Sequence, residues 1–212
     1  MKVTESISKQ ENRQSLISSA KDLFLKYGIK SVSMDDIASI LGKSKKTIYN
    51  LVLNKSKLVE AVVKQYVKEE KLAIDKINQM SQSAIEEMIL IVRQSLKTIS
   101  LLKPTVAYDL KKYHKNSWAI IESEHYSHIE QTIETNINRG IREGYYRNDL
   151  DPKILSKLYM GLAKVVSNED LSHDPDMTVR EVFDAMINYH LHAITNEKGK
   201  KELEIYLNRE AI

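Results

Sequence analysis

The sequence predicts an all-α protein, and three observations support that prediction. The chain of 212 residues is 42% apolar, enough to bury a core and too apolar for general disorder. Only 6 glycines and 3 prolines are present, so few residues force a break in a long helix. Apolar residues also recur at intervals of three and four along much of the chain, which is the period of one helix face.

The first helix is expected at roughly residues 10–27, because apolar residues recur there at helical spacing and Gly28 follows as a C-terminal stop. Its predicted buried face consists of Ile17, Ala20, Leu23, Phe24 and Tyr27.

Residues 33–52 predict a helix, a tight turn and a second helix. Ser33, with Asp36 three residues later, resembles a capping box, and Gly42 ends the helix that it starts. Ser44 then caps the next helix. The residues expected to face inward are Ile37, Ala38 and Leu41 in the first helix and Ile48, Leu51 and Val52 in the second, leaving Lys45, Lys46, Thr47 and Tyr49 outside.

The rest of the chain predicts further helices and two clear boundaries. A helix begins at Asn54 with Leu72 expected on its buried face, and Pro104 ends the helix of 84–102. Gly144 predicts a C-terminal cap, and Asp151 with Pro152 predicts the next start. The remaining expected helices are 104–114, 117–143, 152–168 and 177–194, with a polar loop over 167–176 and a charged, solvated helix after Thr195.

Positive charge is concentrated near the N-terminus. Residues 1–60 carry 11 Lys and Arg against 6 Asp and Glu, whereas the remainder carries 21 against 23. The total of +3 would not by itself indicate nucleic acid, but this distribution is typical of a protein whose N-terminal part alone meets a polyanion.

The pattern over residues 17–58 resembles the DNA-binding domain of the tetracycline-repressor (TetR) family of bacterial regulators. The residues in that family's order and spacing are Ala20, Leu23, Phe24, Gly28, Ser33, Ile37, Ala38, Gly42, Ser44, Thr47, Ile48, Tyr49, Asn54, Lys55 and Leu58. The stretch from Gly140 to Pro152, followed by two apolar helices, is similar to the junction before the family's dimerisation helices. The sequence departs from the family at Lys46, Leu51 and Val52, where members often carry Gly or Pro and an aromatic pair.

The resemblance implies an N-terminal three-helix helix-turn-helix domain over 1–53, linked by the helix of 54–75 to a larger effector-binding and dimerisation domain within 54–212. A helix of this kind presents its first residues to base edges in the major groove, so Lys45, Lys46 and Thr47 are the candidates for base readout. Ser33, Ser44, Tyr49 and Lys55 suit phosphate contacts. The alternative for the two serines is a capping role alone, and for the lysines a solvated face.

Catalysis is not expected, because no phosphate-cradling glycine loop, nucleophile elbow or HExxH motif occurs. His125 and His128, with Glu122 and Glu124 nearby, share a helix face, but no third metal ligand is specified, so neither a metal nor a cofactor is predicted. The resemblance instead implies a small-molecule pocket. Its candidate residues are Tyr108, Tyr113, His114, Trp118, Tyr126 and Met160, whose alternative is plain core or surface packing.

The sequence therefore predicts a cytoplasmic, homodimeric transcriptional regulator, with zero cysteines and no apolar run of membrane-spanning length. Its expected partners are a palindromic double-stranded DNA operator, an effector of unknown identity and a second copy of the chain through 152–168 and 177–194. Repression is favoured over activation. Two alternatives are a helical ligand carrier or interaction module without specific DNA binding, and a DNA-binding protein that has lost its effector.

Overall fold

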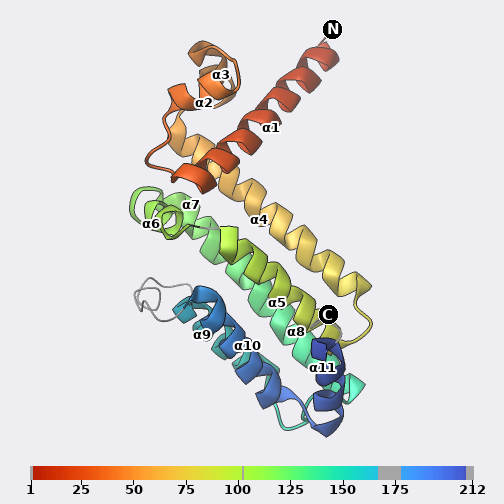
Figure 1. The fold of residues 1–212 in the computed structure, drawn as a ribbon. Helices are drawn as coiled ribbons and strands as arrows, with labels where there is room; N and C mark the ends of the chain where they lie inside the picture. Colours follow the sequence, from red (N-terminus) through yellow and green to blue (C-terminus); the bar gives the residue numbers. More distant parts are fainter. Residues whose placement is uncertain (1, 102, 167–177, 209–212) are drawn as a thin grey trace. The chain divides into compact units, whose positions relative to one another are not determined.

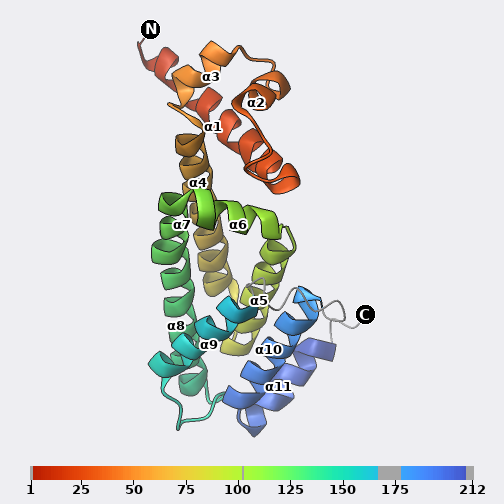
Figure 2. The ribbon, with the colours of Figure 1, turned by 90° about the vertical axis from the view of Figure 1, so that its left-hand side faces the viewer.

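The computed structural model describes residues 2–101, 103–166 and 178–208, and within these ranges it contains helices and no strand (Figures 1 and 2). The all-α prediction is confirmed. The expected loop over 167–176 lies outside the described residues. The helices are α1 (Lys2–Tyr27), α2 (Met34–Ile40), α3 (Lys45–Leu51), α4 (Lys55–Met80), α5 (Ala84–Leu101), α6 (Pro104–Tyr113), α7 (Lys115–Ile120), the π-helix η1 (Ile121–Tyr126), α8 (Ser127–Glu143), α9 (Pro152–Val166), α10 (Val179–Ile194) and α11 (Glu197–Asn208).

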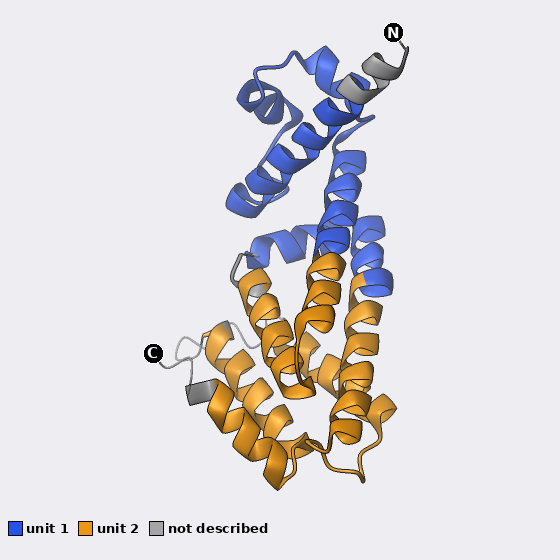
Figure 3. Cartoon of the chain, turned by 90° about the vertical axis from the view of Figure 1, so that its right-hand side faces the viewer, with its two compact units in different colours: residues 1–69, 101–124 blue, residues 70–100, 125–212 orange. Residues whose placement is uncertain are grey.

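The chain divides into two compact units (Figure 3). Unit 1 consists of residues 1–69 and 101–124, and unit 2 of residues 70–100 and 125–212. Helix α4 belongs to both units, because it runs through the boundary at residue 70. The division of the chain at residue 53 is a different one and stays a prediction.

The N-terminal helices of unit 1 close around a small apolar core. Gly28 and Gly42 have φ values of +86° and +60°, a region that side chains with a Cβ rarely adopt, so each lets the chain turn at the end of its helix. The buried side chains of this core are Leu16, Ile17, Ala20, Leu23, Phe24, Ile29, Val32, Met34, Ile37, Ala38, Ile48, Val52, Leu58, Val59, Val62 and Val63. The expectation that Tyr27 is buried is wrong, because its side chain is 55% exposed.

Unit 2 holds the larger core, built from α5, α8, α9, α10 and α11. Its fully buried centre includes Ile85 and Met88 from α5 and Ile133 and Ile137 from α8. No helix of the described residues combines the length and the apolar character needed to cross a bilayer.

A partly buried polar network lies beside this core. Arg139 donates to Glu87 at 2.7 Å, to Glu143 at 2.6 Å and to the backbone carbonyl of Ser81 at 3.0 Å. Tyr146 donates from its hydroxyl to the Asn136 side-chain oxygen at 3.0 Å. Burial raises the pKa of Glu87, and the hydrogen bond from Arg139 opposes that rise. These partners satisfy polar groups that would otherwise be costly to bury.

The structure corrects two sequence expectations for the later helices. Leu72 is 59% exposed instead of buried, and Ile74 takes the buried position on α4 at 2% exposure. The long helix expected over 117–143 begins at Lys115 and contains the π-helical turn η1, so its register changes in mid-course. These two features depend on packing between helices and leave no clear signal in local spacing.

The C-terminal helix α11 is anchored to unit 2, whereas the sequence favoured a solvated tail. Leu203 is 1% exposed, and the side chain of Asn196 donates to the backbone carbonyls of Gly144 and Tyr146. At Gly199 an added Cβ would lie 2.1 Å from the carbonyl oxygen of Tyr145, so only glycine permits this approach.

Candidate nucleic-acid interface

Caps at both helix starts hold the α2–turn–α3 segment in place. The Ser33 hydroxyl accepts from the Asp36 backbone N–H at 3.1 Å, and the Asp36 carboxylate accepts from the Ser33 backbone and hydroxyl, both at 2.7 Å. This is the capping box that the sequence predicts, and the Ser33 bonds lower the pKa of Asp36. The turn closes with Lys43 N–H donating to the Ala38 carbonyl at 2.9 Å.

Ser44 caps helix α3, and its hydroxyl accepts from the Thr47 backbone N–H at 3.1 Å. The hydroxyls of Ser44 and Thr47 also lie 2.8 Å apart. Ser33 and Ser44 are therefore both helix caps, which is the role that the sequence offered as the alternative to phosphate contact. The single hydroxyl proton of Ser33 is directed at Asp36, so a phosphate contact by that hydroxyl requires it to leave this bond.

One face of α3 is polar and exposed, as the sequence predicts. Lys45, Lys46, Thr47 and Tyr49 are all exposed, while Ile48 is fully buried and fixes the helix against the core of unit 1. The Lys45 ammonium pairs with the Asp35 carboxylate of α2 at 2.9 Å, and this partner raises the pKa of Lys45. Sequence reasoning missed that pair.

Lys55 lies at the first residue of α4 and is less free than the lysines of α3. Its ammonium donates to the Lys30 carbonyl at 3.4 Å, in the loop between α1 and α2. Partial burial lowers the pKa of Lys55, against the opposing attraction of Asp109 and Asp36. Lys55 therefore supports the loop in addition to any contact with an external anion.

Helix α6 supports the same loop from unit 1. The buried Asp109 carboxylate accepts from the Lys30 backbone N–H at 2.7 Å, and Lys103 donates to the Lys26 carbonyl at the end of α1 at 2.6 Å. Sequence reasoning missed Asp109. The available signal was its position three residues after Val106, which puts a carboxylate on the apolar face of a short helix.

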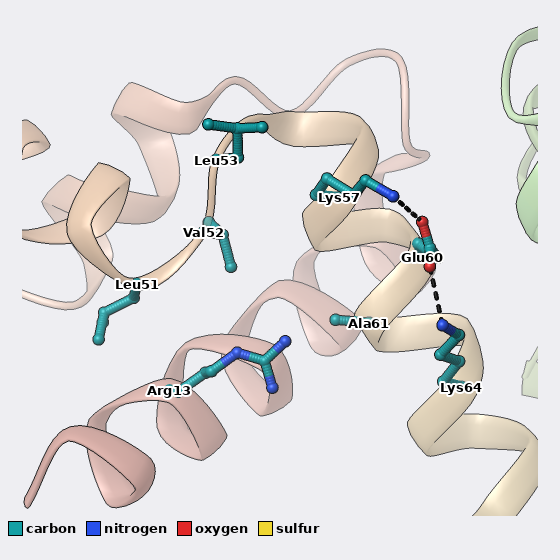
Figure 4. Close-up of a pocket in the computed structure, with 8 residues that line it drawn as sticks. All are labelled: Arg13, Leu51, Val52, Leu53, Lys57, Glu60, Ala61 and Lys64. Atoms are coloured by element: carbon teal, nitrogen blue, oxygen red, sulfur yellow. Dashed lines mark hydrogen bonds and ion pairs between the residues drawn. The ribbon is translucent and has the colours of Figure 1, made fainter. Parts of the chain in front are cut away.

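An open groove of about 300 Å³ adjoins the end of α3 in unit 1 (Figure 4). Leu51, Val52 and Leu53 line it on one side, with Leu53 75% exposed. Glu60 lies between Lys57 at 2.7 Å and Lys64 at 2.8 Å, and these two ammonium groups lower its pKa to about 2. The groove therefore combines an apolar wall with charges that are largely paired.

The six residues proposed for a small-molecule pocket are split between the units. Tyr108 and Tyr113 meet edge to face at 6.4 Å in unit 1, and both are more than two-fifths exposed. His114 and Trp118 belong to the same unit and are half-buried. Tyr126 and Met160 belong to unit 2, where Met160 is buried and Tyr126 packs against the same core.

The two histidines weighed as metal ligands lie in unit 2 at the start of α8 and just before it. His125 is buried, which lowers its pKa to about 4, and His128 Nε2 lies 3.5 Å from an Asp75 oxygen. Among the described residues, no group of three or more histidine or carboxylate side chains is arranged to hold a metal ion.

Helix α9 exposes an apolar stripe opposite its buried residues. Tyr159, Met160 and Val166 face the core of unit 2. The exposed members of the stripe are Ile154 at 57%, Leu158 at 58%, Leu162 at 39% and Val165 at 53%. On α10 the predicted apolar residues Phe183, Met186, Ile187 and Leu191 are instead buried within the unit.

Three comparisons place these features among known proteins. Residues 16–62 match the family described as bacterial regulatory proteins, tetR family. The chain is 25% identical over 169 residues, 79% of its length and 88% of the relative's, to an uncharacterized HTH-type transcriptional regulator, YvaF, of Bacillus subtilis (strain 168).

Solved structures share the fold at low sequence identity. A TetR-family transcriptional regulator from Agrobacterium tumefaciens is similar with a TM-score of 0.70 and 18% identity, covering 89% of this chain and 100% of that one. SmeT, the repressor of the multidrug efflux pump SmeDEF of Stenotrophomonas maltophilia, is similar with a TM-score of 0.61 and 13% identity, covering 87% and 91%. The matched segment 16–62 contains the capped α2–turn–α3 unit and its exposed face.

Proposed function

Because this chain is a DNA-binding transcriptional regulator of the TetR family, we propose that it is a repressor that leaves a palindromic operator when a small molecule binds. The observation that carries the proposal is the exposed polar face of α3, set on two side-chain caps and one buried isoleucine. A rigid short helix with basic and hydroxyl side chains outside is suited to the major groove of DNA.

Within this function, Lys45, Lys46 and Thr47 are the proposed base-reading residues, since they are exposed at the start of α3. A lysine can donate to guanine O6 and N7, and a threonine methyl can pack on a thymine methyl. Tyr49, which is 43% exposed, Lys55 and the capping residues Ser33 and Ser44 are the proposed phosphate contacts. Of these, Ser33 has the least support, because its hydroxyl proton is held by Asp36.

The proposed dimer forms through the predicted helices 152–168 and 177–194, and the exposed stripe of α9 supports it. Four apolar side chains along one face of a helix are unfavourable in water and are buried when two copies pack together. Helix α10 contributes less to this support, because most of its described apolar side chains are already buried, although Tyr189 is 70% exposed.

The proposed effector is a small molecule with an apolar body. Tyr108, Tyr113, His114, Trp118, Tyr126 and Met160 remain the candidate residues, because aromatic and thioether side chains offer large apolar contacts with a few polar groups. The effector's chemical identity is open in this proposal.

Selection of binding sites from random duplex DNA by the purified protein tests the proposal, at ~150 mM salt where non-specific association is weak. We expect a palindrome whose half-sites are spaced by one helical turn or a multiple of it, ~34–36 Å per turn. The matched control is Lys45→Ala with Lys46→Ala, which should remain folded and enrich no sequence. A folded wild-type dimer that enriches no sequence would contradict the proposal.

A further inference from the structure

The exposed Lys45–Asp35 ion pair joins the starts of α3 and α2. The Lys45 ammonium lies 2.9 Å from one carboxylate oxygen of Asp35 and 3.0 Å from the other. The side chains are 61% and 64% exposed, so the pair stands in solvent on the same surface as the polar face of α3. A surface pair of this kind contributes little to folding stability.

The two adjacent acids of α2 have different tasks. Asp36 forms the capping box with Ser33, and one of its carboxylate oxygens, Oδ2, accepts both Ser33 bonds. Asp35 has no part in that cap, and its carboxylate accepts a hydrogen bond from the Lys45 ammonium. An acid next to a DNA-facing lysine weakens the attraction of that lysine to phosphate. Asp35 would therefore be unfavourable on a surface that only contacts the phosphate backbone of DNA.

We propose that Lys45 and Asp35 act as one unit that reads a single G·C base pair, an inference that rests on the proposed operator binding. On the major-groove edge of that base pair, guanine O6 accepts and cytosine N4 donates. These two atoms are hydrogen-bonded to each other, so they lie about 2.9 Å apart.

The pair matches this edge in both chemistry and spacing. The Lys45 ammonium has three donors and retains at least one for guanine O6 while it holds Asp35. The carboxylate retains lone pairs that accept from cytosine N4. The separation of 2.9–3.0 Å between the two charged groups is the separation of the two base atoms that they would contact. The ion pair can therefore dock without being broken.

The same pair disfavours binding to random DNA. A phosphate that attracts Lys45 also meets the negative charge of Asp35 beside it. Asp35 is thus a specificity-determining residue, which strengthens one base preference and reduces sequence-independent attraction.

The test is binding-site selection, followed by titration against the selected site and against random duplex at several salt concentrations. Asp35→Ala and Lys45→Ala should each lose preference at the same base pair of each half-site, by about 5-fold or more. Asp35→Ala should also bind random DNA about 3- to 10-fold more tightly at ~100 mM salt, with a salt slope steeper by about one per protomer. Asp35→Asn, which keeps an acceptor oxygen, should retain part of the base preference.

Glu60→Gln is the matched control, because it removes one paired carboxylate from the same unit without changing α2 or α3. It should leave every base preference unchanged. If Asp35→Ala and Lys45→Ala relax different positions, or if Asp35→Ala keeps the wild-type preference throughout, the reading unit is overturned while the operator proposal stands. A wild-type protein that enriches no sequence overturns both.

Discussion

Helices α3 and α9 both expose one face to solvent, but the two faces have opposite chemistry. The exposed face of α3 carries lysines, a threonine and a tyrosine, whereas that of α9 carries four aliphatic side chains. Each helix is fixed by residues on its other face, Ile48 in α3 and Tyr159 in α9. The difference teaches that the face that folding does not use decides which class of partner a helix suits: the face of α3 suits a polyanion, and the face of α9 suits an apolar surface.

Leu158→Glu should have the largest effect, because it places a charge in the middle of the α9 stripe. If two copies pack through that stripe, the variant buries two unpaired carboxylates and raises the dimer Kd at least about 1,000-fold, ~4 kcal/mol. Light scattering at micromolar protein measures the change. Lys153→Glu, on the same helix at an exposed position outside the stripe, should remain dimeric. A dimeric Leu158→Glu protein would remove α9 from the interface.

A second prediction compares the two faces of α3. Ile48→Ala removes a side chain that is 0% exposed and should lower the free energy of unfolding by about 2–5 kcal/mol. Lys46→Ala, on the exposed face, should change it by less than about 0.5 kcal/mol while weakening DNA binding. Thermal unfolding and a DNA titration of the same preparations separate the two effects. Equal unfolding transitions for both variants would contradict the division of the helix into two faces.

A third prediction concerns the pH dependence of stability. The polar groups on α3 are solvated, whereas His190 in α10 is 6% exposed and lies beside Tyr159. Burial lowers the pKa of His190 to about 4, so the unfolded chain takes up a proton more readily than the folded one. Above pH ~6.5 the histidine is neutral in both the folded and the unfolded chain, so its titration does not change the free energy of unfolding there. As the pH falls from ~6.5 through 4, the unfolded chain binds the extra proton, and the free energy of unfolding drops by up to ~3 kcal/mol.

Unfolding measured between pH 4 and 7 tests this assignment. His190→Phe keeps a ring against Tyr159. It should reduce the number of protons taken up on unfolding, which the slope of the free energy of unfolding against pH reports, by about one. His192→Gln, at an exposed position of the same helix, should leave the dependence unchanged. An identical slope in wild type and His190→Phe would assign the acid sensitivity to other groups, such as His125.

The smallest predicted effect separates positioning on the backbone from base readout. Lys55→Ala should weaken binding to all sequences alike and reduce the salt slope by about one, whereas Thr47→Ala should relax preference at particular base pairs. Titration of both variants against the selected site and random duplex provides the measurement. Equal losses on both DNAs for both variants would show that this division of roles is wrong.

Local signals in the sequence were sufficient for the framework of the α2–turn–α3 segment. Ser33, Asp36, Gly42 and Ser44 act within three or four residues of themselves, through caps and a left-handed backbone, so their roles follow from spacing alone. The same holds for Gly144 at the end of α8, with φ +71°. These are the elements whose boundaries the sequence predicts best.

Features that depend on distant partners were not predictable. Asp109 meets Lys30 across 79 residues of sequence, and Lys45 meets Asp35 across a helix, a turn and a new helix start. Leu72 has an apolar side chain but faces solvent, and the charged C-terminal segment is held by Leu203 and Gly199. In each case tertiary packing, which local pattern does not report, decides the outcome.

The hydroxyl contact between Ser44 and Thr47 has a consequence for the entropy of binding. Because the two oxygens lie 2.8 Å apart, the Thr47 side chain already occupies one rotamer before any partner arrives. A side chain that is ordered in the free protein loses little conformational freedom on docking. Contacts made by the Thr47 methyl group would therefore be retained almost entirely as affinity, whereas the long exposed chain of Lys46 must give up rotational freedom to make its own.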